Sequence, residues 1–157
     1  MTSSMAVDGR YVAVIGGTEA SSSVEADAEA VGRLLAEAGV IVVTGGREGV
    51  AAAASRGAME AGGLTVGILP GHDRDEANPW VRIAVPTGLG ELRNALVVMD
   101  ADAVIALPGA YGTLIEIAFA LLSNTRVVGL GNWALGEGVS ILCGDTPADV
   151  VRLALEP

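Results

Sequence analysis

The sequence predicts an α/β fold: a three-layer, doubly wound parallel sheet of about six to seven strands. Short runs rich in β-branched residues alternate with longer stretches of helical periodicity, which is typical of parallel strands joined by helical crossovers. Glycine makes up 22 of the 157 residues, about twice the usual share of ~7%. These glycines gather just after the predicted strands, where ligands bind in open α/β sheets.

The predicted strands are short apolar runs bounded by glycine and polar residues. They span Tyr11–Ile15, Val40–Val43, Thr65–Leu69, Val81–Val85, Ala103–Leu107 and Val127–Leu130, with a short seventh strand over Val139–Cys143. A chain of this length fits one domain. We expect a flexible N-terminal tail over residues 1–10 and a single domain over residues 11–157.

Helix signals lie between these strands. Ser22–Glu25 reads as a capping box that starts a helix ending at Gly39, with Val24, Ala28, Val31 and Leu35 on one face. A helix of small residues is predicted over 50–61, and a last helix starts at Thr146-Pro147 and runs to about Leu155.

The composition excludes several kinds of chemistry. All nine basic residues are arginine, so the chain lacks the lysine of a P-loop and the Schiff-base lysine of a pyridoxal phosphate enzyme. One cysteine and one histidine cannot build a zinc site from protein ligands, and we expect no bound metal. A single cysteine also allows no internal disulfide, which fits a reducing cytoplasm.

The charge balance argues against two kinds of partner. A net charge of −10 repels phosphate backbones and anionic membrane surfaces, so we expect neither nucleic acid nor membrane as a partner. The first ten residues lack an apolar core typical of a signal peptide, and no apolar run is long enough to span a bilayer. We therefore expect a cytoplasmic protein.

Two glycine turns follow the first two strands and are candidate ligand loops. The residues concerned are Gly16, Gly17, Thr44, Gly45, Gly46 and Gly49. Neither turn fits the G-x-G-x-x-G pattern with a later acidic residue, so NAD binding is a weak alternative. The simpler interpretation is that glycine serves only the tight geometry of these turns.

The segment 106–116 predicts a phosphate cradle, because a strand leads through a glycine turn into a helix start with free backbone N–H groups. The candidate ligand-binding residues are Pro108, Gly109, Ala110, Tyr111, Gly112 and Thr113. Glu116 has two interpretations of similar weight. With Thr113 it forms a capping-box pattern, whereas on a helix this apolar it is also an isolated carboxylate at a cleft.

A second candidate segment is Pro86–Ala95, where Thr87 or Gly88 is predicted to cap a helix that carries Arg93 and Asn94 in its first two turns. Arg93 could then reach the ligand edge of the sheet. The alternative is a solvated arginine that pairs with Glu91 or Asp100.

Together these segments resemble the Rossmann-like family that contains LOG-type phosphoribohydrolases and molybdenum-cofactor carrier proteins, often mislabelled lysine decarboxylases. The match covers about residues 12–133. Its most specific parts are Gly45-Gly46-x-x-Gly49, residues 67–71, 76–79 and 86–88, Arg93-Asn94, and Pro108-Gly109-Ala110-Tyr111-Gly112-Thr113-x-x-Glu116.

The resemblance implies a nucleoside 5′-monophosphate phosphoribohydrolase with Arg93 and Glu116 as catalytic residues and no required cofactor. A decarboxylase is excluded by the missing lysine. Two positions depart from the hydrolase pattern: Ala110 replaces the second motif glycine, and Asn94 stands where hydrolases usually carry lysine. The alternative is a non-catalytic carrier of molybdenum cofactor or another small phosphorylated ligand. In either case we expect a homodimer or homotetramer formed through apolar helices.

Overall fold

A computed structural model describes residues 9–131, 133, 135–139 and 141–157. Most of the expected tail, residues 1–8, lies outside these described residues. The strands are β1 (Tyr11–Ile15), β2 (Ile41–Thr44), β3 (Thr65–Leu69), β4 (Ile83–Pro86), β5 (Ala103–Ala106), β6 (Arg126–Leu130) and β7 (Leu142–Gly144). The helices are α1 (Ser22–Glu37), α2 (Val50–Glu60), α3 (Arg93–Val98), α4 (Tyr111–Leu122) and α5 (Pro147–Leu155).

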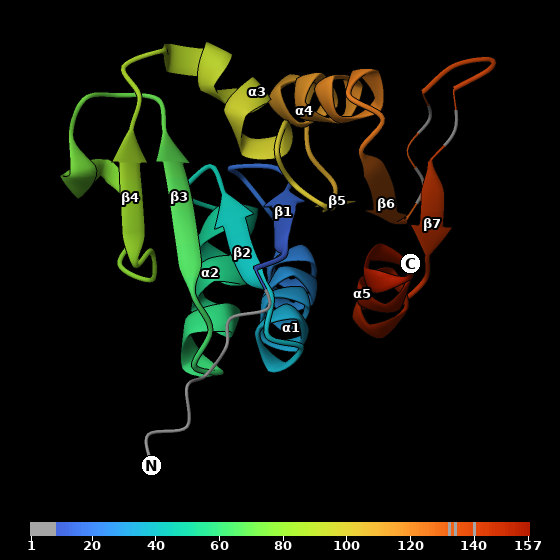
Figure 1. The fold of residues 1–157 in the computed structure, drawn as a ribbon, viewed down its shortest axis with the longest axis horizontal. Coiled ribbons are helices and arrows are strands. Elements are labelled where there is room, and N and C mark those ends of the chain that lie inside the picture. The colour runs from blue at the N-terminus through green and yellow to red at the C-terminus, as the bar shows by residue number, and fades with distance from the viewer. Residues whose placement is uncertain (1–8, 132, 134, 140) are drawn as a thin grey trace.

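The seven strands form one all-parallel sheet in the order β4-β3-β2-β1-β5-β6-β7. This confirms the predicted Rossmann-like α/β class. Helices α1, α2 and α5 cover one face of the sheet, and α3 and α4 lie on the other side (Figure 1). The strand order reverses between β1 and β5, which places the topological switch point in the middle of the sheet.

Both faces of the central strand β1 are buried, in two separate cores. Val12 and Val14 belong to the core under α1, α2 and α5, whereas Ala13 and Ile15 belong to the core under α3 and α4. Side chains alternate between the faces of a strand, so a short apolar run is what a doubly covered strand requires.

Several predicted element ends shift by one to three residues. β2 starts one residue later than expected, and β4 starts at Ile83 because the Thr65 hydroxyl first binds the 80–82 segment, donating to Trp80 O at 2.7 Å and accepting from Arg82 N at 2.9 Å. The seventh strand also starts late, at Leu142, and position 140 of the predicted run lies outside the described residues.

Helix α1 is capped by Ser21, one residue before the predicted capping box, and its side chain accepts from Val24 N at 3.3 Å. The prediction of Ser22 as the first capping residue is therefore wrong. For α5 the predicted start is confirmed, since Thr146 caps it through Asp149 N at 3.1 Å and Pro147 is its first residue.

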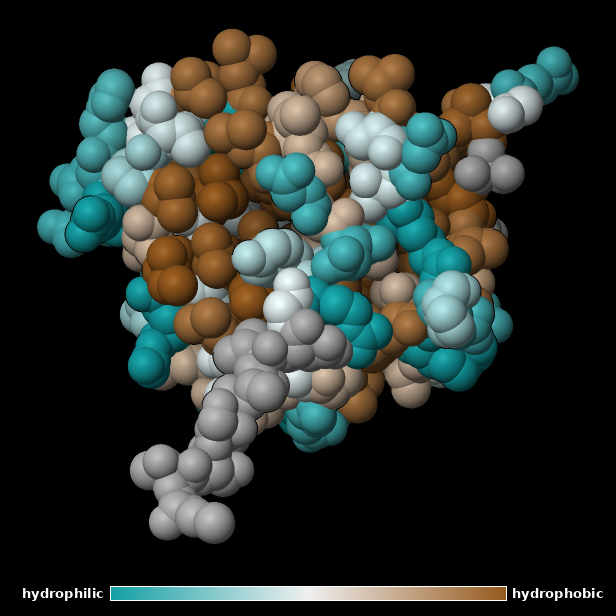
Figure 2. All heavy atoms as spheres, viewed as in Figure 1, coloured by the Kyte–Doolittle hydropathy of each residue, from teal (hydrophilic) through white to brown (hydrophobic). Residues whose placement is uncertain are grey.

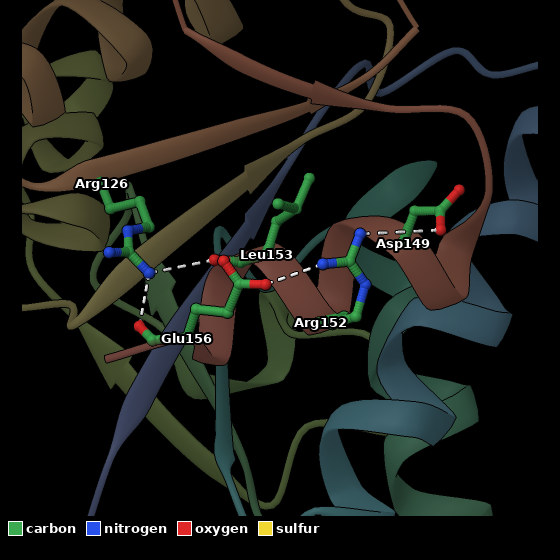
Figure 3. Close-up of polar contacts among 5 residues, drawn as sticks. All are labelled: Arg126, Asp149, Arg152, Leu153 and Glu156. Atoms are coloured by element: carbon green, nitrogen blue, oxygen red, sulfur yellow. Dashed lines mark hydrogen bonds and ion pairs between the residues drawn. The ribbon is translucent and has the colours of Figure 1, made fainter.

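The C-terminal end of α5 is hydrogen-bonded to strand β6 of the sheet through Arg126. Arg126 of β6 donates to the backbone carbonyls of Leu153 and Glu156, and Arg152 lies between Asp149 and Glu156 on the helix surface (Figure 3). Carbonyls at a helix C-terminus lack partners within the helix. A cation placed there satisfies them and stabilises the helix dipole.

Candidate functional site

A polar cavity of about 280 Å³ lies at the switch point of the sheet. Its walls come from the turns after β1, β2 and β5 and from the starts of α2, α3 and α4. Of the predicted site residues, those that line it are Gly16, Gly17, Gly45, Arg93, Asn94, Ala110, Gly112, Thr113 and Glu116. The tertiary structure thus brings together segments that are up to about a hundred residues apart.

Other predicted site residues lie elsewhere. Thr87 donates to Leu69 O at 2.7 Å and accepts from Leu89 N at 3.2 Å, so it shapes a turn instead of capping the helix with Arg93. That capping prediction is wrong: a 3₁₀ turn (Gly90–Leu92) comes first and α3 begins at Arg93 itself. Outside the lining of the cavity are also Thr44, Gly46, Gly49, Gly88, Pro108, Gly109 and Tyr111.

The glycine turns after β1 and β5 are locked to each other. Gly17 N donates to Pro108 O at 2.9 Å, and Gly17 O accepts from Val50 N at 3.0 Å. The N–H of Gly17 is therefore used inside the protein. At Gly109 any side chain would overlap the Thr113 hydroxyl, so glycine here permits close packing of the turn.

Helix α4 begins without a side-chain cap. Its N-cap is Ala110 and no side chain accepts from its first turn. Thr113 is the third helical residue, so the alternative in which Thr113 and Glu116 form a capping box is wrong. The N–H groups of the first helical turn have no partner within the helix and are the natural donors for an anion.

Arg93 is buried beside these amides, with only 9% of its surface exposed. Its Nε has no hydrogen-bond partner, and its guanidinium packs so closely over Gly45 that a methyl group there would overlap it. The alternative of a solvated surface arginine is wrong. Glu91 is held instead by Asn94, whose amide donates to it at 3.1 Å.

Glu116 is also buried, at 7% exposure. Burial raises the pKa of this carboxyl to about 8, with Arg93 opposing the rise and Glu91 adding to it. Burial likewise lowers the pKa of Arg93, and Glu116 is the largest opposing influence. The two side chains make no ion pair within 4.0 Å. At neutral pH the cavity therefore holds a cationic arginine and a mostly protonated glutamic acid.

Arg47 and Glu48 also line this cavity, although the motifs alone did not single them out as site residues. Both are exposed and sit in the turn 45–49 between β2 and α2. In the sequence, the glycines on either side of Arg47 and Glu48 already mark this turn as a candidate ligand loop. The two side chains between those glycines could have been included as site residues, because loops at a binding site contact ligands through side chains as well as backbone.

The fold and the cavity define a doubly wound α/β protein with a polar cleft at its switch point. The chain belongs to the SLOG cluster4 family, whose model matches residues 9–149. An uncharacterized protein of Archaeoglobus fulgidus is 37% identical over 144 residues, covering 92% of this chain and 93% of the relative.

Two solved structures are similar over nearly the whole chain. The molybdenum cofactor binding protein of Rippkaea orientalis is 35% identical with a TM-score of 0.86, covering 92% of this chain and 94% of that one. The molybdenum cofactor carrier protein MCP of Chlamydomonas reinhardtii is 30% identical with a TM-score of 0.83 and the same coverage. Both of these similar proteins are named for molybdenum cofactor, and neither is named as a phosphoribohydrolase.

No helix in the described part of the chain is both long and apolar enough to cross a bilayer.

Proposed function

We propose that this chain binds and carries a phosphorylated pterin of the molybdenum cofactor class. The observation that carries the proposal is the buried Arg93, which lines the same cavity as the uncapped start of α4. Hydrogen bonds from a guanidinium to an anion are charge-assisted and stronger than neutral ones. An anionic ligand in this cavity would gain such bonds from Arg93 and further bonds from the amides at the start of α4.

The protonation state of Glu116 supports anion binding. With a pKa of about 8, its carboxyl is mostly neutral at pH 7 and does not repel a phosphate. A neutral carboxyl can also donate one hydrogen bond.

Cofactor retention tests the proposal. Purified protein is mixed with molybdenum cofactor, separated from free ligand by gel filtration, and assayed for the fluorescence of the oxidised pterin. We expect pterin to elute with the protein and inorganic phosphate to compete for it. Elution of all pterin as free ligand would contradict a carrier role.

A LOG-like phosphoribohydrolase is the second candidate function, favoured by the presence of Arg93 and Glu116 in one cavity. Incubation with nucleoside 5′-monophosphates separates the two functions. A carrier releases no free base over hours, whereas a hydrolase yields base and ribose 5-phosphate. If base is released, Glu116→Gln should reduce that rate about 100-fold or more.

We also propose that the protein is a homo-oligomer that associates through the outer face of α3 and α4. Hydrophobic side chains gather over these helices and the adjoining β3 and β4 (Figure 2). Leu92, Leu96, Leu114, Ile115 and Leu122 are all exposed, Leu122 at 79%. The charged residues of the two helices, Arg93 and Glu116, are both buried.

A second copy of this chain is the occupant that this face fits best. Two copies with a net charge of −10 each repel one another, and contact through an uncharged surface brings no like charges into direct opposition. Light scattering after gel filtration tests this. Wild type should elute as an oligomer and Leu96→Glu/Leu122→Glu as a monomer with unchanged circular dichroism. A monomeric wild type would contradict the proposal.

A further inference from the structure

A second cavity, of about 460 Å³, lies beside the first and has no role in the proposed phosphate site. The two cavities share Arg47 and Glu48, so the turn 45–49 forms the boundary between them. Its other walls come from the starts of α1 and α2 and from the loop between β3 and β4. Its volume lies within the range of small-molecule sites, about 300–1,000 Å³.

The wall formed by the β3–β4 loop is pinned in place by Asn78. Asn78 N donates to Gly46 O and its side-chain amide donates to Arg47 O, both at 2.8 Å. Its Oδ1 accepts from Trp80 N at 3.1 Å. The loop that carries Trp80 is thereby attached to the turn that carries Arg47, so the aromatic wall is preorganised.

Planar and hydrogen-bonding groups line this cavity together. The Arg56 guanidinium lies 5.3 Å from the centre of the Trp80 ring and is held by Glu29 at 2.7 Å. Indole rings and guanidinium planes are the groups on which nucleobases stack in proteins. Glu25 and Glu76 add carboxylates, which accept hydrogen bonds from ribose hydroxyls.

Arg47 supplies a positive charge at the boundary. It is exposed and lines both cavities. In the described part of the chain it makes no ion pair. An anionic linker that crosses from one cavity to the other would pass this guanidinium, which binds phosphate oxygens in pairs.

We propose that the second cavity binds the nucleoside end of a two-part ligand: a phosphorylated pterin joined to a nucleoside through a diphosphate. The pterin end lies in the first cavity, the diphosphate at Arg47, and the base against Trp80 and Arg56. This inference rests on the proposed carrier function and extends it, since it assigns the nucleotide-extended form of the cofactor as the preferred cargo.

Comparison of two ligand forms tests the assignment. The dissociation constants of the pterin monophosphate form and of the nucleotide-extended form are measured for wild type, Trp80→Leu and Ala52→Phe. Trp80→Leu removes the stacking surface, and Ala52→Phe projects an aromatic ring into the second cavity from α2. Wild type should bind the extended form about tenfold more tightly, the effect of a single base stack.

Both variants should lose that preference and bind the short form as wild type does, which also shows that they are folded. If Trp80→Leu does not fold, Ala52→Phe alone decides. Equal affinity of wild type for the two forms, or a preference that persists in Ala52→Phe, would overturn the second site and leave the carrier proposal intact. Failure of wild type to bind either form would overturn both proposals.

Tryptophan emission gives an independent readout. The chain has two tryptophans, so Trp133→Phe leaves emission from Trp80 alone. Guanosine, adenosine and cytidine 5′-monophosphates are the probes, with inorganic phosphate as the control. We expect the nucleotides to quench Trp80 and phosphate to leave it unchanged. Identical spectra with and without all three nucleotides would contradict base binding at Trp80.

Discussion

The two faces of the sheet place their charged residues in opposite ways. On the face of α1, α2 and α5, charged side chains lie outside in ion pairs such as Arg33–Glu37 and Arg152–Glu156. On the face of α3 and α4, the helices bury Arg93 and Glu116 and expose leucine and isoleucine instead. Exposed ion pairs are typical of a surface that only faces solvent. The face of α3 and α4 instead brings its two charged side chains to the cavity and leaves an exposed apolar surface.

The N-termini of the helices also differ, because only some of them have a side-chain cap. Ser21 and Thr146 cap α1 and α5 with side-chain oxygens, whereas α2 and α4 start at Gly49 and Ala110 without a side-chain cap. The two uncapped starts both adjoin the cavity. At Ala110 of α4 the missing cap costs about 1 kcal/mol of helix stability and leaves amides that are available to an anion, whereas Val50 N of α2 already donates to Gly17 O. Stability and binding are therefore assigned to different helices.

We call the sheet face covered by α1, α2 and α5 the structural face. Its stability should be most sensitive to substitutions at the contact between α1 and α2. A side chain at Gly57 would overlap the backbone carbonyl of Glu29, and one at Gly32 would overlap that of Ala54. We expect Gly57→Val to lower the free energy of unfolding by about 3 kcal/mol, because two helix backbones must separate. Urea unfolding measures this, with the exposed substitution Glu60→Ala as control. A shift below ~1 kcal/mol would show that the two helices separate easily.

On the sheet face covered by α3 and α4, the largest effect on ligand affinity should come from Arg93. Arg93→Gln removes the buried charge that faces the ligand, and we expect phosphate or pterin affinity to fall about 100-fold. Arg74→Gln is the matched control, since Arg74 lies in an exposed 3₁₀ turn and lines neither cavity.

Gly45→Ala offers a second way to disturb the same group without removing its charge, because its methyl group would overlap the guanidinium. Affinity should fall in this variant too. Unchanged affinity in both Arg93→Gln and Gly45→Ala would mean that the anion binds elsewhere.

Glu116 predicts a pH dependence of the stability of the folded chain. Its folded pKa of about 8 lies above the ordinary 4.5, so between these values the folded chain holds more protons than the unfolded one. Stability from this group is fully present below pH 4.5 and is lost as pH rises through about 8, at most ~1.4 kcal/mol per pH unit.

Glu116→Gln should remove this slope. Melting temperatures of the two proteins, measured from pH 5 to pH 9, should therefore diverge, with wild type declining relative to the variant. Parallel curves would show that the carboxyl titrates at its ordinary value.

The smallest effect should come from the exposed pair Arg33–Glu37, 3.3 Å apart on α1. Arg33→Ala should change the free energy of unfolding by less than about 0.5 kcal/mol, because solvent and salt screen such pairs. Ligand affinity should not change. A loss comparable to that of Gly57→Val would require a structural role for this arginine beyond the ion pair.

The sequence by itself determined the class of fold and most of its elements. Strand β1 and the start of α5 at Thr146-Pro147 follow from local patterns, namely a β-branched run and a capping residue before proline. The glycine turns that adjoin the cavity were also predictable, because parallel strands bring their carboxyl ends to one edge of the sheet.

Only the tertiary structure decided what each candidate group does. Whether the N–H of Gly17 is free depends on Pro108, and the position of Thr87 depends on Leu69 in another strand. The pKa of Glu116 depends on burial and on Arg93 from a different helix. Hydrogen-bond partners and desolvation come from segments far apart in the chain, so a local pattern specifies the elements while their packing specifies the chemistry of the site.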